Sequence, residues 1–150
     1  MAQPLYRTLL LFVTLFLIAC GTSSPGVQQE ANVGAASACI ERVIAMDDSL
    51  GTVRNHACEQ ISLSETIQQY VQSLEKVDFQ NCPSAFTTAF QRHLEAWTQM
   101  ITVTDHYPDL RGEMHDLFDI IEQGEYQAEF KPRLAAIWDT WSEVERAMGE

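Results

Sequence analysis

The sequence predicts an all-α protein, a small up-and-down antiparallel bundle of four or five helices. Apolar residues recur about every 3.5 residues through most of residues 38–150, which is the spacing of one helix face. Strand signals are poor, because alternating Val, Ile and Thr residues are few and no Asn-Gly or Asp-Gly turn occurs. The connections between the periodic segments are short, which favours antiparallel neighbours in one bundle.

Two helices are predicted in the first half of the body, over residues 37–58 and 63–77. Gly51 interrupts the first at a cost of about 1 kcal/mol relative to alanine. Ser62, followed three residues later by Glu65, forms a capping-box pattern that starts the second. The apolar positions of the two helices are Ile40, Val43, Ile44, Leu50, Val53, Ala57, Ile67, Tyr70, Val71, Leu74 and Val77.

Three further helices are predicted in the second half. One begins with Pro83, where the missing N–H of proline costs nothing, and ends near Thr104. The next spans residues 109–121 and is closed by Gly124, a residue type favoured just beyond a helix end. The last periodic segment spans residues 130–144, and its Pro132 marks either the start of the helix or a kink.

The N-terminal residues differ from the rest of the chain. Arg7 is the only charged residue before Glu30, and nine of the ten residues at 9–18 are strongly apolar. A membrane-spanning helix needs about 20 apolar residues, so this run is too short to cross a bilayer. A basic residue followed by a short apolar run is typical of a secretory signal peptide. The alternative is a buried helix at the N-terminus.

The junction after the apolar run is more specific. The sequence LIAC at residues 17–20, followed by Gly21, resembles the lipobox of bacterial lipoproteins. The resemblance covers only residues 1–20. It implies that residues 1–19 are a lipoprotein signal peptide and that Cys20 receives a diacylglyceryl group, becomes the mature N-terminus and accepts a further acyl chain such as palmitate. The alternative is cleavage elsewhere, with Cys20 an ordinary cysteine.

A lipoprotein anchor implies a place in the cell envelope. Each buried CH₂ contributes about 0.8 kcal/mol, so two or three acyl chains hold a protein stably at a membrane. Residue 21 is glycine, whereas an aspartate there often favours the inner membrane in Gram-negative lipoproteins. The resemblance therefore favours the outer membrane, facing the periplasm, if the source is Gram-negative.

Residues 20–37 are expected to form a flexible tether between the lipid and the folded body. The segment is small, polar and rich in Gly, Ser and Ala, so it buries too little apolar surface to order itself. A coil of the 17 residues 21–37 spans about 22 Å on average. The body, residues 38–150, is then held clear of the lipid headgroups.

Three cysteines are left once Cys20 is assigned to the lipid. An odd number in an oxidising compartment leaves one unpaired or bonded to another molecule. Cys39 and Cys82 begin the first and third helices, which places both at one pole of an antiparallel bundle, whereas Cys58 lies about 28 Å from Cys39. A disulfide needs Cα atoms within roughly 7 Å, so the sequence favours Cys39–Cys82. A break at Gly51 would instead let Cys58 approach Cys82.

Charge excludes one class of function. The chain has 9 basic and 21 acidic residues and a formal net charge of −12, whereas nucleic-acid binding needs a basic surface. Loss of Arg7 with the signal leaves 8 basic and 21 acidic residues, a charge of −13. Anionic lipid repels such a surface, which complements a basic protein, a cationic peptide or a divalent cation.

No motif identifies a catalytic or cofactor site, and no cofactor is expected. HExxH, CxxC, Walker and GxSxG sequences are absent from the chain. His106, His115 and Asp119 are candidate ligands for zinc or copper, because they lie in one acidic part of the chain and His115 and Asp119 are one helical turn apart. The alternative is a solvated acidic helix face with incidental histidines.

Aromatic residues at helical spacing either form the core or line an apolar pocket, and the sequence does not separate the two. The predicted function is a non-enzymatic, membrane-anchored lipoprotein that binds another envelope protein. The alternative is a lipoprotein that binds a small ligand or metal through an aromatic pocket or the His/acidic cluster. The aromatic set comprises Phe86, Phe90, Trp97, Tyr107, Phe118, Tyr126, Phe130, Trp138 and Trp141.

Overall fold

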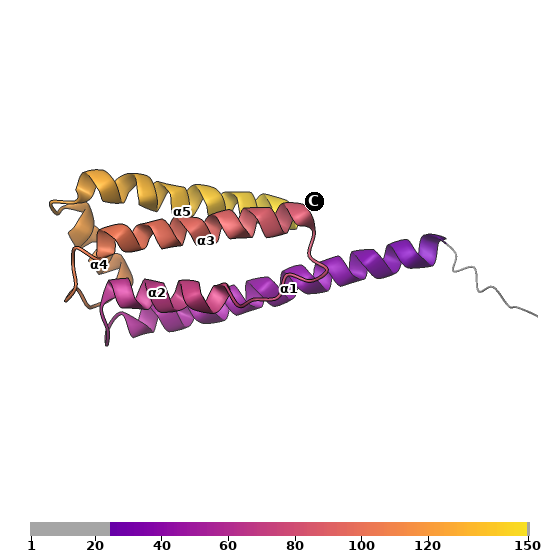
Figure 1. Ribbon diagram of the computed structural model, residues 1–150, viewed down its shortest axis with the longest axis horizontal. Coiled ribbons are helices and arrows are strands. Elements are labelled where there is room, and N and C mark those ends of the chain that lie inside the picture. The colour runs from indigo at the N-terminus through magenta and orange to yellow at the C-terminus, as the bar shows by residue number, and fades with distance from the viewer. Residues whose placement is uncertain (1–24, 150) are drawn as a thin grey trace, which may run out of the picture.

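The computed structural model describes residues 25–149, which form five α-helices and, within that range, no strand (Figure 1). The predicted all-α class is confirmed. The predicted signal peptide and the predicted lipidation site, Cys20, lie outside the described residues. The helices are α1 (Pro25–Ala57), α2 (Leu63–Leu74), α3 (Ser84–Thr104), α4 (Met114–Glu122) and α5 (Gln127–Met148).

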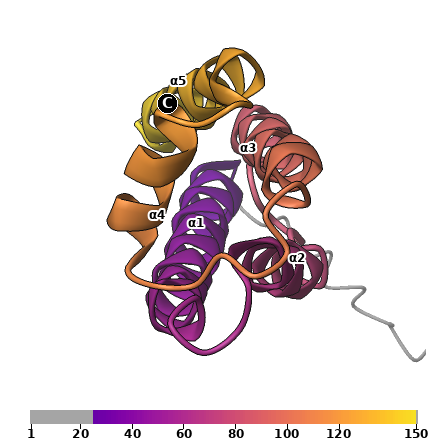
Figure 2. The ribbon, with the colours of Figure 1, turned by 90° about the vertical axis from the view of Figure 1, so that its left-hand side faces the viewer.

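The main helices run up and down, as predicted. In Figure 1, α1 and α3 run toward the end of the molecule that carries α4, and α2 and α5 run back from it. α1 packs on α2, α2 on α3, and α3 on α5 over the longest interface, while the short α4 packs on α5. α1 and α5 make few direct contacts, and Figure 2 shows α4 beside both at that end of the bundle. The bundle is therefore least closed between α1 and α5.

α1 begins twelve residues earlier than predicted. Residues 25–37, predicted as flexible coil, are helical instead, because Ala, Gln and Glu favour helix and extending an existing helix needs no new nucleus. Most of the side chains described between residues 29 and 38 are exposed, and this part of α1 projects from the body (Figure 1). At 1.5 Å per residue the projection is about 20 Å long.

Cys39 and Cys82 join α1 to the start of α3. Their Cα atoms lie 5.1 Å apart and their sulfur atoms are bonded, which confirms the predicted pairing. Cys58 is buried and carries a free thiol, which donates a hydrogen bond to the carbonyl of Asn55 over 3.0 Å. Cys58 lies just beyond the opposite end of α1, because that helix continues through Gly51 without a break.

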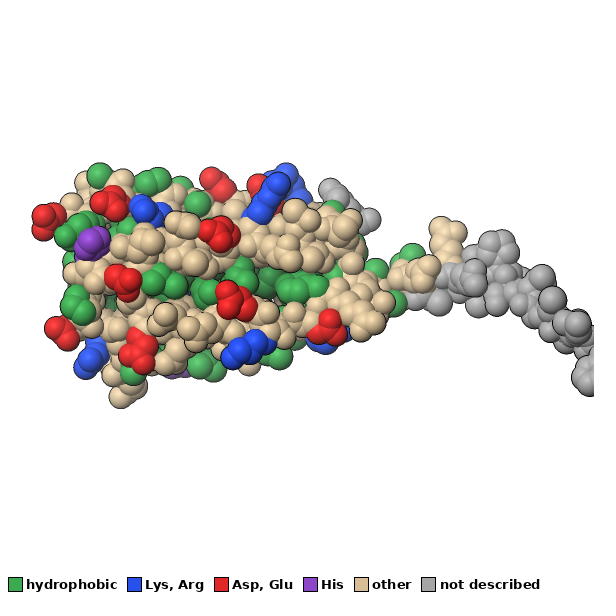
Figure 3. Space-filling view, in the orientation of Figure 1, with side chains coloured by type: hydrophobic (Ala, Val, Ile, Leu, Met, Phe, Trp, Pro, Cys, Tyr) green, Lys and Arg blue, Asp and Glu red, His purple; other side chains and the backbone are tan. Residues whose placement is uncertain are grey.

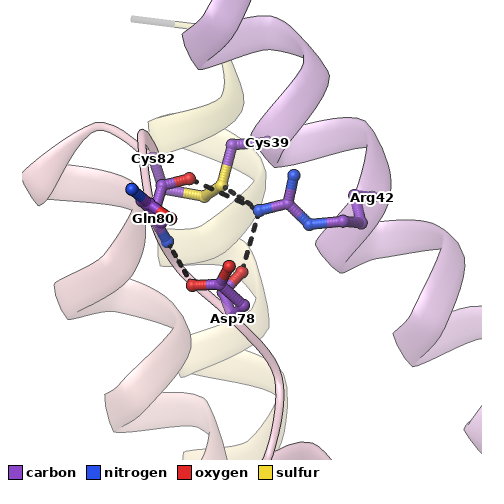
Figure 4. The surroundings of a disulfide bond; sticks show 5 residues. All are labelled: Cys39, Arg42, Asp78, Gln80 and Cys82. Atoms are coloured by element: carbon purple, nitrogen blue, oxygen red, sulfur yellow. Dashed lines mark hydrogen bonds between the residues drawn. A yellow bond between two sulfur atoms is a disulfide. The ribbon is translucent and has the colours of Figure 1, made fainter.

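Arg42 closes the same end of the bundle. Its guanidinium donates to the carbonyl oxygens of Asp78, over 2.9 Å, and Gln80, over 3.4 Å, in the loop between α2 and α3 (Figure 4). The same Nη2 atom lies 3.2 Å from Cys39 Sγ. We call the disulfide, Arg42 and this loop the disulfide end of the molecule.

The helix starts follow local capping chemistry in part. Ser62 caps α2 as predicted, since its hydroxyl accepts a hydrogen bond from the Glu65 backbone N–H over 3.3 Å. α2 ends at Leu74 rather than at residue 77. α5 begins at Gln127 and continues through Pro132, so that proline does not mark the start of the helix.

α4 is shorter than predicted, because residues 109–113 are not helical. The Leu63 N–H donates to the carbonyl of Leu110 over 2.9 Å, and the Gly112 N–H donates to the carbonyl of Cys58 over 2.9 Å. Gly112 has φ 151°, which side-chain-bearing residues rarely adopt. These backbone bonds tie the approach to α4 to the junction between α1 and α2, and the Glu113 carboxylate then caps α4.

The core lies between the helices and is rich in aromatic and aliphatic side chains. Phe86, Phe90 and Phe130 are fully buried, and the first two rings lie 5.9 Å apart between centroids. Figure 3 shows one face of the molecule, on which hydrophobic side chains form a band between α2 and α3 with acidic side chains along it. Part of the predicted aromatic set is therefore core.

Candidate functional site: a cavity between α1 and α5

A cavity of about 330 Å³ lies where α1 and α5 fail to close the bundle. α1 lines it with residues between Asp47 and Asn55, α5 with residues between Leu134 and Trp141, and α4 with Met114, His115 and Phe118. Small-molecule sites are mostly apolar concavities of about 300–1,000 Å³ with a few polar groups. The size and lining of this α1–α5 cavity fall in that class.

All three tryptophans of the chain line the cavity. Trp97 is buried at its base, Trp141 is half-buried, and Trp138 is 62% exposed. The Trp141 indole N–H donates to Glu145 Oε1 over 3.1 Å. The structure thus divides the aromatic set that the sequence left together: one part forms the core, and these rings with Phe118 surround the cavity.

Arg54 lies in the cavity wall with its guanidinium over two aromatic rings. Its central carbon is 4.2 Å from the Trp97 ring centroid and 4.5 Å from that of Tyr70. Nε and Nη2 both donate to Asn55 Oδ1 over 3.3 Å. Among residues 25–149, no carboxylate oxygen lies within 4.0 Å of it. Burial lowers the pKa of Arg54, yet a guanidinium remains charged at neutral pH.

Asp47 and Tyr70 form a buried pair beside Arg54. The Tyr70 hydroxyl donates to Asp47 Oδ1 over 2.6 Å, and both side chains are buried. Burial raises the pKa of the Asp47 carboxyl, and burial together with the Asp47 charge raises the pKa of the Tyr70 hydroxyl. Tyr70 therefore keeps its proton at neutral pH and occupies one oxygen of Asp47.

His93 lies at the base of the cavity as a neutral side chain. The Trp97 indole N–H donates to His93 Nε2 over 3.0 Å, so the proton of the ring is on Nδ1, which donates to Thr140 Oγ1 over 3.1 Å. Burial lowers the pKa of His93 to about 4. His93 thus links α3 to α5 with both ring nitrogens occupied.

The candidate metal ligands are not brought together. The His106 ring stacks on Tyr126 with centroids 3.8 Å apart, and His115 Nδ1 lies 2.7 Å from Glu113 Oε1. Asp119 is exposed on α4. Within the part of the chain that the structure describes, no three His, Cys, Asp or Glu side chains cluster as metal ligands.

The sequence analysis missed Asp47, Arg54 and Tyr70 as site residues. A signal was present, because Asp47 and Arg54 fall in the same three- and four-residue spacing as Val43 and Leu50. Charged residues inside an apolar stripe point into a packed region, where they need partners or a ligand.

Comparison with known proteins identifies no relative. No family model, curated protein or solved structure matches this chain. None of the helices that the structure describes is both long and apolar enough to span a bilayer.

Proposed function

We propose that the protein is a lipid-anchored, non-enzymatic binding protein of the bacterial cell envelope, and that a small ligand occupies the α1–α5 cavity. The observation that carries the proposal is the cavity itself, about 330 Å³ in volume and lined by every tryptophan of the chain. This is the small-ligand alternative of the sequence analysis. Recognition of another envelope protein stays a prediction from the sequence.

The lining favours binding of an apolar body. Leu134, Ile137 and Phe118 line the cavity together with Trp138, whose large ring is left 62% exposed. A bundle of this size has few aromatic residues to spare from its core. A ligand in the cavity would cover apolar surface that the helices leave in contact with water, which contributes about 25 cal/mol per Å².

The polar groups of the cavity favour holding a ligand over reacting with it. Both nitrogens of His93 are hydrogen-bonded, and the Asp47 carboxylate accepts from Tyr70. A general base must reach a reacting proton, and a nucleophile needs such a base beside it. The arrangement therefore supports a binding role.

The anchor part of the proposal rests on the lipobox resemblance at residues 17–20. An acylated Cys20 would place the protein on an envelope membrane, and on the periplasmic face of the outer membrane in a Gram-negative cell. The exposed part of α1, about 20 Å long, would then space the cavity from the headgroups.

The cavity is tested with a neutral fluorescent probe, N-phenyl-1-naphthylamine, which brightens in apolar sites. Gly51→Phe places a ring at the cavity wall, because a Cβ at Gly51 lies 3.8 Å from Arg54 Nη2, and it should abolish saturable binding. Gly34→Phe is the matched control, since a Cβ there meets open space on the same helix. Equal binding by the two variants, or no saturable binding by the unchanged protein, would overturn the proposal.

The anchor is tested by metabolic labelling with an alkyne fatty acid in a bacterial host. The chain should incorporate the label and partition with membranes, and Cys20→Ser should do neither. Mass spectrometry of an unlabelled mature chain that starts at another residue would contradict the anchor and leave the cavity proposal standing.

A further inference from the structure

Arg54 differs from the paired cations on the described surface. Arg92 lies 3.2 Å from Glu143 and Lys131 lies 3.6 Å from Glu122, both exposed pairs. Arg54 is half-buried and, within residues 25–149, has no carboxylate oxygen within 4.0 Å. In a chain with 21 acidic and 9 basic residues, a guanidinium that lines a cavity without a carboxylate of the described residues at ion-pair distance is in a position to bind an anionic ligand.

The position of the guanidinium leaves hydrogen-bonding capacity free. Its contact with the Trp97 and Tyr70 rings is made through their π faces, which are not hydrogen-bond acceptors of the usual kind, and the group carries five N–H donors. Among the described residues, Asn55 Oδ1 is the one acceptor within hydrogen-bond geometry, at 3.3 Å from Nε and Nη2. Burial lowers the pKa of this guanidinium, while the Tyr70 hydroxyl and the Asp47 carboxylate lie near enough to raise it against the effect of burial. Gly51 leaves the approach to Nη2 without a side chain.

We propose that the α1–α5 cavity takes a monoanion with an apolar body, a carboxylate or sulfonate on an aromatic or aliphatic skeleton, and that Arg54 binds its anionic group. This inference rests on the proposed function and names the ligand class. A guanidinium binds such oxyanions through two parallel hydrogen bonds in its plane. The apolar body would lie against Ile137, Trp138 and Phe118.

The acidic groups of the cavity set the charge of the ligand. Asp47 and Asp48 line the same cavity, and only Asp47 is held by a hydrogen bond from Tyr70. A second negative charge on the ligand would meet these carboxylates, because His93 is neutral and His115, the other histidine of the lining, has its Nδ1 2.7 Å from Glu113 Oε1. The lining therefore matches one anionic group, with the rest of the ligand uncharged.

The test compares three ligands with one body: 1-naphthaleneacetate, 1-naphthaleneethanol and 1-naphthaleneethylammonium. Isothermal titration uses the full chain with Cys20→Ser, which removes the anchor and changes no described residue. The acid should bind at least about tenfold tighter than the alcohol, the increment of one good charged contact. The ammonium should bind more weakly than the alcohol.

Arg54→Met should erase the preference for the acid and keep the affinity for the alcohol. Arg92→Met is the matched control, because that arginine lies outside the cavity, and it should keep the preference. The headgroup series on the unsubstituted cavity decides the question even if Arg54→Met does not fold.

The outcomes separate the two proposals. Equal affinity for acid and alcohol, or tightest binding of the ammonium, would overturn the role of Arg54 while the cavity remains a binding site. Failure of all three ligands together with the neutral fluorescent probe would overturn the proposed function as well.

Discussion

Arg42 and Arg54 lie twelve residues apart on α1, and their guanidinium groups have different surroundings. Arg42 donates to the carbonyls of Asp78 and Gln80 and fastens a loop to the helix. Arg54 lies over Trp97 and Tyr70 at the edge of a cavity. The same residue type fastens a loop at one end of the bundle and lines a cavity at the other, where we propose that it binds a ligand.

The surroundings of Arg42 and Arg54 differ because different segments pack beside α1 at its two ends. At the disulfide end, the α2–α3 loop brings Cys82 and two backbone carbonyls to the helix. At the cavity end, α5 stays apart from α1 and the lining includes residues of α4. We therefore expect the disulfide end to determine stability and the cavity end to determine binding.

Removal of the disulfide should have the largest effect. Cys39→Ala with Cys82→Ala opens a loop with a sequence separation of 43 residues, which should lower the free energy of unfolding by about 4 kcal/mol. Urea unfolding with and without reductant measures the loss, and the double variant should not respond to reductant. Ligand affinity should stay the same at low urea, and a parallel loss of affinity would contradict the separation of the two ends.

Low pH should lower the stability of the fold through protonation of His93, which lies in the cavity wall. Its pKa is about 4 in the folded protein and about 6.5 in the unfolded chain, so the unfolded chain binds the proton first as the pH falls. Neutral His93 therefore contributes its full share to the free energy of unfolding above pH 6.5. Between about pH 6.5 and pH 4 the free energy of unfolding should fall by about 3 kcal/mol. Urea unfolding at several pH values measures it. His93→Gln should flatten this part of the profile, and an unchanged slope would refute the assignment.

The two arginines should differ in their effect on stability. Arg42→Met removes hydrogen bonds to two carbonyls and should cost about 1–2 kcal/mol. Arg54→Met removes a guanidinium with no carboxylate oxygen of the described residues within 4.0 Å and should change stability by less than about 1 kcal/mol, because relief of its desolvation offsets the loss of stacking and of the longer-range attraction to Asp47. Thermal or urea unfolding of both variants measures the two losses of stability. A larger loss for Arg54→Met than for Arg42→Met would contradict the assignment of different roles to the two arginines.

Gly51→Ala should have the smallest effect on stability, and the effect should be an increase in the free energy of unfolding. Alanine is about 1 kcal/mol better than glycine inside a helix, and its Cβ would make an ordinary contact 3.8 Å from Arg54 Nη2. Gly34→Ala, in the exposed part of α1, should change the urea midpoint less, because that part does not pack on the body. A larger gain at Gly34 would show that the projecting helix is coupled to the core.

Prediction from the sequence succeeded where the signal is local or follows from helix geometry. Ser62 caps α2 through a residue three positions away. The Cys39–Cys82 pair followed from counting residues along antiparallel helices. The start of α4 was missed, because Leu110 and Gly112 form their backbone bonds with residues far back in the chain.

The candidate site was predicted only as a set of alternatives. Trp138 and Trp141 belong to the same aromatic set at helical spacing as Phe86 and Phe90, yet the first two line the cavity and the last two lie in the core. The metal alternative placed His106 and His115 together on sequence proximity, whereas the structure gives each its own partner.

The sequence by itself determined the helical class and most of the helix positions and favoured the Cys39–Cys82 disulfide, because periodicity, capping and rise per residue act along the chain. Only the tertiary structure decided that α5 stays apart from α1, and with it which aromatic rings line a cavity and that Arg54 is unpaired there. The distance between two helices depends on all the side chains that pack between them and their neighbours. The spacing of apolar residues along one helix does not specify that distance.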